Sequence, residues 1–430
     1  MVPSTPSISR APRFGGLWRH ADFLKLWGGQ TISLFGTLAT PYTLAAILLF
    51  HATAAQVALL TAARYAPGVV VGLFAGVMAD RVRRRPLMIA ADIGRALLLG
   101  SLPVAAVFGW LSLRQLVVVT LLVSVLTVVF DVAYRAYLPT LVPRKYLVEG
   151  NAKLEASAAV AEVAGLGLSG VFLQLLTAPG TFLVDALSFV ASAVTLGLIR
   201  APEPPRVADP SSVEAPTNAW REIRAGVRFV FGTPMLRALA GAEATMSLFG
   251  NVIGVVILLD WTERLGLSPL VIGLVGGVGG ISAFVGAALS PQIMRRWGLG
   301  RTLVRAFLLT RLSTFFIVLA GGPTWFAVTL LLTQQVFGDA PYTVFDIAAA
   351  TVRQSATPEP LLGRMNASFQ FLTWTAMLGG IALGGVLGGT VGTRAALLVG
   401  TIGASGAALW LVRAPLHDTG VSIGEGTGVW

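Results

Sequence analysis

Carboxyl groups are scarce in the long apolar stretches of this sequence, and they are the groups there that could carry a proton. Glu162, Glu243 and Asp339 lie within such stretches. A carboxyl group holds its proton more tightly in a low-dielectric cavity than in water. These three acids are therefore candidates for proton coupling in a cavity that alternates between wet and dry. For Asp339, a fixed ion pair with Arg311 is an equally good alternative.

Polar side chains recur at steps of three and four in four apolar stretches, which places each set on one helical face. Polar groups inside a membrane are costly, so we expect these faces to line a cavity that binds a small-molecule substrate. Hydrogen bonding between helices explains single residues well, but four aligned sets less well. The candidate cavity residues are Gln30, Ser33, Thr37, Ser124, Thr127, Ser247, Asn251, Gln335 and Tyr342, with the arginines Arg64 and Arg311.

The elements that must position these residues are transmembrane helices. Hydrophobic residues make up 55% of the chain and charged residues 12%, about half the charged share of an average soluble protein. A helical span needs about 20 mostly apolar residues. Twelve stretches qualify: 27–50, 55–79, 87–109, 114–137, 156–177, 180–199, 236–260, 269–291, 302–320, 324–347, 367–389 and 394–412. The sequence therefore predicts an all-α membrane protein.

Other functional classes are poorly supported. The chain has no cysteine, which excludes disulfides and thiolate metal sites. Its three histidines lie near predicted helix ends or in the tails, so they form no catalytic or metal cluster. The net charge of +11 rests on too few charges for a nucleic-acid-binding face. We expect no enzyme, no cofactor, no metal and no nucleic-acid partner, and we expect membrane lipids around a monomer.

The basic residues mark one side of the membrane. Of the 31 lysines and arginines, 26 fall in the tails, or in and beside the connections, on one side of the predicted spans. By the positive-inside rule, both termini are expected in the cytoplasm. The first 21 residues contain no apolar core of a signal peptide, so the first span is expected to direct insertion.

The chain divides into two related halves. Segment 200–235 is rich in proline and charge and separates six predicted spans from six. At an offset of 215 residues, Phe130-Asp131 matches Phe345-Asp346, and Pro143 matches Pro358. We predict an N-terminal six-helix bundle with its tail (1–199), a linker (200–235), a C-terminal six-helix bundle (236–413) and a tail (414–430). Within the linker, 220–231 predicts an amphipathic helix, either on the inner leaflet or solvated. Six plus six spans are typical of secondary transporters.

The connection after the second span carries a charged motif, Gly76 to Arg85, that reads GVMADRVRRR. It resembles the G-x-x-x-D-R-x-G-R-R signature of the major facilitator superfamily, at the same place in the topology. Arg83 replaces the usual glycine, and Ser290 replaces the acid in a degraded copy after the eighth span. We therefore expect only the first half to carry a working charge latch, meaning contacts that hold the cytoplasmic ends of the two halves together in one state. The expected latch and gating residues are Gly76, Asp80, Arg81, Arg84, Arg85, Asp92, Arg95, Asp131 and Arg135.

Further stretches resemble the enterobactin-exporter and macrolide-efflux branch of this superfamily: 131–139, 185–189 and 362–364. The resemblance implies that spans 1, 4, 7 and 10 converge on a central cavity. It also implies a proton-coupled exporter of amphiphilic small molecules in a prokaryotic inner membrane, with the proton gradient as its energy source. Asp185 and Asp260 lie near predicted outer span ends, which favours roles as caps or anchors.

Three alternatives differ in mechanism. A lipid or lysolipid flippase of the same fold would need lateral openings between helices 5 and 8 or 2 and 11. A membrane enzyme would need a nucleophile–base pair, metal-ligand spacing or a phosphate loop, none of which the sequence offers. A non-transporting sensor would lack a soluble output domain.

Overall fold

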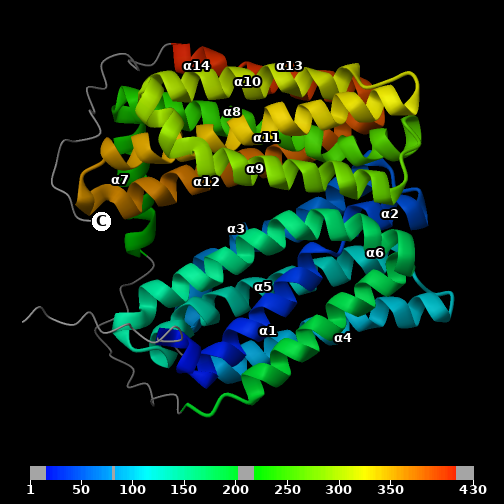
Figure 1. The fold of residues 1–430 in the computed structure, drawn as a ribbon, viewed down its shortest axis with the longest axis vertical. Coiled ribbons are helices and arrows are strands. Elements are labelled where there is room, and N and C mark those ends of the chain that lie inside the picture. Colours follow the sequence, from blue (N-terminus) through cyan, green and yellow to red (C-terminus); the bar gives the residue numbers. More distant parts are fainter. Residues whose placement is uncertain (1–15, 80–82, 202–216, 413–430) are drawn as a thin grey trace, which may run out of the picture.

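The computed structural model describes residues 16–79, 83–201 and 217–412, and every regular element in these ranges is a helix (Figure 1). The first half contains η1 (Gly16–Arg19), α1 (Ala21–Leu38), α2 (Tyr42–Phe50), α3 (Ala54–Ala79), α4 (Arg84–Val107), α5 (Leu113–Leu141), η2 (Arg144–Tyr146) and α6 (Leu147–Gly197). The linker carries α7 (Thr217–Gly232). The second half contains α8 (Pro234–Leu259), η4 (Asp260–Arg264), α9 (Pro269–Trp297), α10 (Leu299–Leu319), α11 (Thr324–Ser355), η5 (Glu359–Leu361), α12 (Leu362–Thr390), α13 (Thr393–Ser405) and α14 (Ala408–Val412).

The helices are long and apolar enough to make the protein an integral membrane protein. Nine stretches of the described helices meet the length and hydropathy expected of a span. α3 and α11, at 26 and 32 residues, are also long enough to cross. α6 has 51 residues and would be about 76 Å long if straight, more than twice the thickness of a bilayer core.

α6 accordingly folds back on itself at Thr177, whose φ of 61° and ψ of 171° are not helical. The indole N–H of Trp27 in α1 donates to the Ser157 hydroxyl over 2.8 Å, so the first limb of α6 lies beside α1. Two residues on, Gly29 packs against Thr195 in the second limb. One stretch of α1 therefore contacts both limbs, which run antiparallel as spans 5 and 6. With this reversal, the described helices account for the twelve predicted crossings.

Two prolines within the predicted spans, Pro41 and Pro341, have different effects on their helices. The first span breaks at Pro41, with α1 ending at Leu38 and α2 beginning at Tyr42. Helix α11 instead runs on through Pro341. Proline removes one helical hydrogen bond in either case, but only the break at Pro41 separates two helices.

The two halves repeat the same local structure. Pro143 precedes the 3₁₀ turn η2 and the start of α6, and Pro358 precedes η5 and the start of α12. Both bounds of η2 and the first residue of α6 are displaced by 215 residues from their counterparts in η5 and α12. In Figure 1, α1–α6 form one bundle and α8–α14 the other. The duplication inferred from the sequence is thus present in the helix boundaries.

The halves meet through two helix crossings at one end of the molecule. At one crossing, α6 meets α9: a Cβ on Gly170 would lie 2.7 Å from Gly273 Cα and would also collide with the Pro269 carbonyl. At the other, α12 meets α3: a Cβ on Gly385 would lie 2.6 Å from Ala58 Cβ. Subtracting 215 from Gly385 gives Gly170, and adding 215 to Ala58 gives Gly273, so the crossings are equivalent. Small residues allow such backbone contact between membrane helices.

We predict that Gly170→Val forces the halves apart at this end, because a valine side chain has no room against the α9 backbone. The native chain has no cysteine, so spin labels on introduced cysteines at positions 51 and 322 can report the distance between the halves there. We expect that distance to increase. Gly100→Val is the matched control, because nothing lies within 4 Å of a Cβ at Gly100. An unchanged distance distribution in Gly170→Val would contradict the proposed crossing.

Candidate substrate cavity

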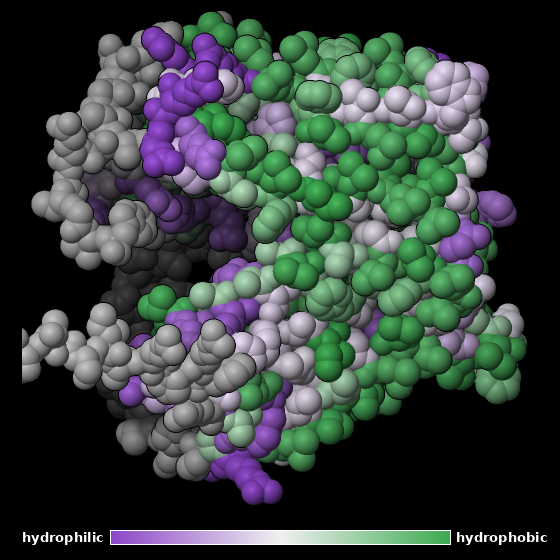
Figure 2. All heavy atoms as spheres, viewed as in Figure 1, coloured by the Kyte–Doolittle hydropathy of each residue, from purple (hydrophilic) through white to green (hydrophobic). Residues whose placement is uncertain are grey.

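A cavity lies between the two halves, in two adjoining lobes of about 380 and 480 Å³. Both lobes are lined by Thr37, Tyr42, Arg64, Tyr65 and Thr120. Figure 2 shows the halves parting at the end where α7 lies, into a hollow whose walls are hydrophilic. The outer faces of both bundles are largely hydrophobic in the same view. The molecule is therefore open at the end where α7 lies and closed at the opposite end, where the crossings lie.

Five predicted residues line the lobes: Thr37, Arg64, Ser124, Thr127 and Asn251. They come from spans 1, 2, 4 and 7. Aromatic and thioether side chains that were not predicted form another part of the wall: Tyr42, Tyr65, Trp261, Trp374 and Met377. Polar periodicity cannot reveal such residues, because Trp and Met in a membrane helix face lipid, core or cavity with the same sequence pattern.

Six predicted cavity residues do not line these lobes: Gln30, Ser33, Ser247, Arg311, Gln335 and Tyr342. Several of them instead satisfy hydrogen bonds between helices. The Ser247 hydroxyl donates to the Thr373 carbonyl over 2.8 Å, and the Gln335 amide donates to the Val275 carbonyl over 3.2 Å. Ser33 is buried in helix packing, Gln30 is half-buried on α1, and Tyr342 is exposed on α11 away from the lobes.

Span 10 does not contribute its polar face to these two lobes, so its expected place in a substrate cavity stays a prediction. That face lies against α9, where Gln335 and Asp339 both pack on Gly279. The lobes are lined instead by spans 2, 5, 8 and 11 in addition to 1, 4 and 7. The two lobes are lined by these four spans because both lobes lie close to the crossings. There α6 contacts α9 and α3 contacts α12.

Arg64 is the charged side chain that lines both lobes, and no Asp or Glu from the described residues joins it there. Its guanidinium carbon lies 5.2 Å from the centre of the Tyr42 ring. Within the described ranges, Arg64 has no ion pair. The cavity thus combines hydroxyl groups, aromatic rings and one positive charge.

A buried acid lies directly behind this wall. Asp185 in the second limb of α6 is 0% exposed. It accepts hydrogen bonds from the Thr37 hydroxyl over 3.2 Å and from the Tyr42 hydroxyl over 3.3 Å. The expectation that Asp185 is a cap or an anchor at an outer span end is wrong, because its carboxyl group is fully buried and hydrogen-bonded to side chains of α1 and α2. Asp260 does lie at an outer helix end, where it binds Arg264 through both carboxylate oxygens, at 2.6 and 2.7 Å.

Asp92 and Arg95, predicted gating residues, form a buried ion pair within the first half. The Arg95 guanidinium lies between two aromatic rings, 4.4 Å from the centre of Phe130 and 4.2 Å from that of Phe189. It also donates to the Thr127 hydroxyl over 3.4 Å. Arg95 therefore joins α4, α5 and α6. Asp131 and Arg135, one turn apart on α5, are both exposed, and Asp131 lies near Arg95.

The motif arginines bind helix ends inside their own half. Arg85 donates to the Leu196 and Gly197 carbonyls at 2.9 and 2.6 Å, and Arg84 donates to the Ala136 carbonyl. In this open state they therefore hold the C-terminal ends of α5 and α6, which is where cations are favoured. Gly76 lies in α3, where only the backbone is described, and Asp80 and Arg81 lie outside the described residues. The latch itself stays a prediction.

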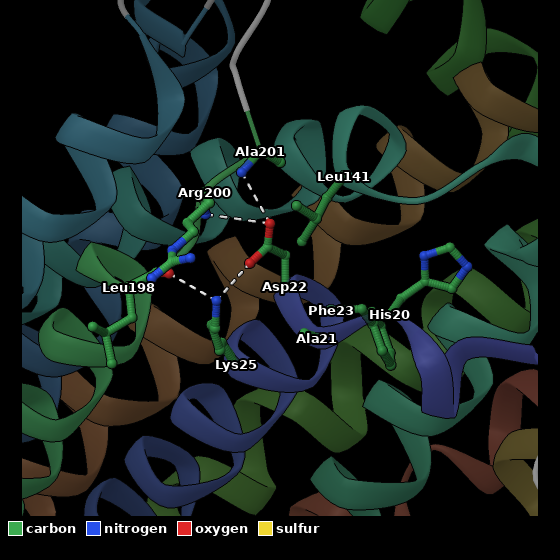
Figure 3. Close-up of a pocket in the computed structure, with 9 residues that line it drawn as sticks. All are labelled: His20, Ala21, Asp22, Phe23, Lys25, Leu141, Leu198, Arg200 and Ala201. Carbon is green, nitrogen blue, oxygen red and sulfur yellow. Dashed lines mark hydrogen bonds and ion pairs between the residues drawn. The ribbon is translucent and has the colours of Figure 1, made fainter.

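The first turn of α1 completes this arrangement at the end of α6 (Figure 3). Asp22 accepts hydrogen bonds from the backbone N–H groups of Arg200 and Ala201, at 3.2 and 2.9 Å. Lys25 lies 2.7 Å from Asp22 and donates to the Leu198 carbonyl over 2.8 Å. Spans 1, 3 and 6 are thus tied together at one point, so the first half is expected to move as a unit.

The three predicted proton-coupling acids have different surroundings. Glu243 on α8 forms an ion pair with Arg353 on α11, with 2.6 Å between Oε2 and Nη1. Asp339 has no ion pair with Arg311 or any other described residue, so the alternative of a fixed pair is not what the structure shows. Arg311 lies instead 5.8 Å from the centre of the Phe307 ring. Glu162 is exposed on α6.

The Glu243–Arg353 pair allows a stability test. The Glu243 side chain is 13% exposed and that of Arg353 is 18% exposed. Removing either charge therefore leaves the other charge unpaired in a poorly hydrated site. We expect Glu243→Gln and Arg353→Met to destabilise the protein singly, with a coupling free energy of roughly 1–3 kcal/mol in the double-mutant cycle. Unfolding of the purified protein in mixed micelles measures it.

The pair Glu149–Lys153, at 3.4 Å, is the control, because its carboxylate is more hydrated, at 36% exposure against 13% for Glu243, and its coupling is expected to stay below about 1 kcal/mol. Equal coupling in the two pairs would contradict a structural role for the Glu243–Arg353 ion pair.

Comparison with known proteins identifies the family. The sequence model described as Major Facilitator Superfamily matches residues 26–344. The chain belongs to this superfamily of transporters. Among its curated relatives, the uncharacterized MFS-type transporter YfiS of Bacillus subtilis is 26% identical over 87% of this chain and 89% of its own length. The enterobactin exporter EntS of Salmonella typhimurium is 27% identical (76% and 73%), and the multidrug efflux pump Tap of Mycolicibacterium fortuitum 25% (82% and 85%).

Solved structures share the fold. A bacterial homologue of the iron transporter ferroportin in an inward-facing state superposes with a TM-score of 0.67, at 18% identity, over 91% of this chain and 98% of its own. The outward-facing state of a bacterial ferroportin homologue gives a TM-score of 0.52 over the same shares, at 17% identity. The resemblance to the superfamily drawn from the sequence is therefore confirmed.

Proposed function

We propose that this chain exports amphiphilic small molecules by proton-coupled alternating access. The observation that carries the proposal is the cavity between two pseudo-equivalent halves, closed at one end by backbone crossings and open at the other. Its hydroxyl, aromatic and single cationic groups suit a partly apolar molecule better than a sugar. The relatives EntS and Tap, an enterobactin exporter and a multidrug efflux pump by name, support export as the direction.

The open end is proposed to face the cytoplasm of a prokaryotic cell, in its inner membrane. The described chain begins and ends there, and so do the arginine-bearing helix ends, such as the starts of α4 and α10 and the end of α9. The positive-inside rule places such an end in the cytoplasm. The better superposition on an inward-facing transporter agrees with this orientation.

Proton coupling is proposed to rest on acids that have no fixed ionic partner. Asp185 and Asp339 have no ion pair with a described residue and are buried and half-buried, whereas Glu243 is held by Arg353 and Glu162 is exposed. A buried carboxylate without a counter-ion is costly, so binding and release of a proton there is strongly coupled to hydration. When the cavity changes its opening, the hydration of these acids changes with it.

A flippase of the same fold is less well supported. It would need lateral openings where α6 meets α9 or where α3 meets α12. At the closed end those two helix pairs are in direct contact through Gly170, Gly273, Gly385 and Ala58.

Transport in everted membrane vesicles with an acidic lumen tests the proposal. Compounds are chosen by a growth-resistance panel of antibiotics and metabolites in a pump-deficient bacterial host. We expect uptake of at least one amphiphilic compound, and we expect nigericin to abolish it by collapsing the pH gradient. Uptake that survives nigericin would contradict proton coupling, and absence of uptake for every compound would contradict export.

The acids are tested in the same vesicles. Asp185→Asn and Asp339→Asn are each expected to lower the pH-driven component at least about tenfold, because each removes a group that exchanges a proton on hydration. Glu263→Gln is the control, since Glu263 is exposed at an outer helix end. Unchanged pH dependence in both aspartate variants would contradict this assignment of the acids.

A further inference from the structure

The cavity wall carries a positive charge without a matching negative one. Arg64 lines both lobes, and no carboxylate of the described residues lines either. Its guanidinium makes no hydrogen bond or ion pair with the described residues and stacks on Tyr42 alone. A charge inside a membrane protein normally pairs with another residue or marks a binding site.

The other charged residues near Arg64 do not line the lobes. Asp185 lies on the far side of Tyr42, is fully buried and accepts hydrogen bonds from Thr37 and Tyr42. Arg95, the next cation, is paired with Asp92 and enclosed by two rings. Arg64 and Asp185 both contact Tyr42 but form no ion pair with each other, so the N–H groups of the guanidinium remain available to a ligand.

The residues that line the lobes around Arg64 indicate the chemistry of the rest of the ligand. Tyr65 and Trp374 line one lobe beside it, and Trp261 and Leu258 line the other. Aromatic and aliphatic side chains of this kind bind flat or branched apolar groups. A guanidinium binds planar or tetrahedral oxyanions with two parallel hydrogen bonds.

We infer that Arg64 is a specificity-determining residue that binds the anionic group of an amphiphilic substrate, so the transported class is aromatic or apolar organic anions rather than cations. This inference rests on the proposed transport function and names its substrate class. Carboxylates, sulfonates and phenolates share the required chemistry. A cationic amphiphile would meet a like charge in both lobes and no acid at their surface.

Binding of three pyrene probes to the purified protein in lipid nanodiscs tests the inference. 1-Pyrenebutyrate, 1-pyrenebutanol and 1-pyrenebutylamine share one apolar body and differ in charge. Energy transfer from tryptophan to pyrene reports binding, with empty nanodiscs subtracted. We expect the native protein to bind the butyrate at least about tenfold more tightly than the other two.

The variants separate a charge contact from a structural effect. Arg64→Gln is expected to reduce the preference for the butyrate to within about twofold while keeping affinity for the butanol, and Arg64→Lys to retain part of the preference. Arg311→Gln, which removes another intramembrane arginine outside the lobes, is expected to leave it unchanged. A preference that persists in Arg64→Gln, or a native protein that binds the amine as tightly as the butyrate, would overturn the inference.

Failure of this inference is distinguishable from failure of the proposed function. pH-driven uptake of the probes into everted vesicles without preference for the anion would overturn the anion site but would still support the proposed export function. An Arg64-dependent preference in binding, with no uptake of any probe or panel compound, would support the anion site and overturn export.

Discussion

The backbone contact between α6 and α9, repeated between α3 and α12, is the constraint on which the rest of the structure depends. At each crossing glycine brings two helices into contact with almost no side chain between them. The two crossings are related by the duplication at 215 residues, so they flank the cavity symmetrically. Two equivalent, closely packed contacts at one end leave the halves able to separate at the other, and this produces a cavity with a single opening.

The charged residues within the spans are of two kinds: some form ion pairs inside one half, and one lines the cavity between the halves. Arg95 with Asp92, and Arg353 with Glu243, link helices within one half and are paired. Such pairs contribute little net stability, but losing one partner is costly, so they help to maintain the packing within each half. Arg64 has no such partner and lies where the halves meet. The proposed change of opening would therefore involve one charge that is free to bind a substrate between the two halves.

Much of this fold follows from the sequence, because membrane spans are set by composition and helix period. The twelve crossings, the break at Pro41 and the duplication were all predictable. The cavity was predictable only in part: Thr37, Ser124, Thr127 and Asn251 line it, but Tyr65, Trp261 and Trp374 gave no periodic signal. Asp185 was misplaced because local sequence does not show that Thr37 and Tyr42 bind its carboxyl group in the core of the first half. Partners of buried charges depend on tertiary packing, which local sequence does not encode.

The central claim, that the cavity opens on the arginine-rich side, is tested most directly by accessibility of a single introduced cysteine. Ser124 lines the cavity and the chain has no native cysteine, so Ser124→Cys reports on this site alone. The measurement is its modification by a membrane-impermeant thiol reagent, in everted vesicles and in intact cells, with protease digestion of an N-terminal tag marking the cytoplasmic face. The structure predicts modification from the cytoplasmic face and protection from the other. Modification only from the outer face, or equally from both, would contradict it.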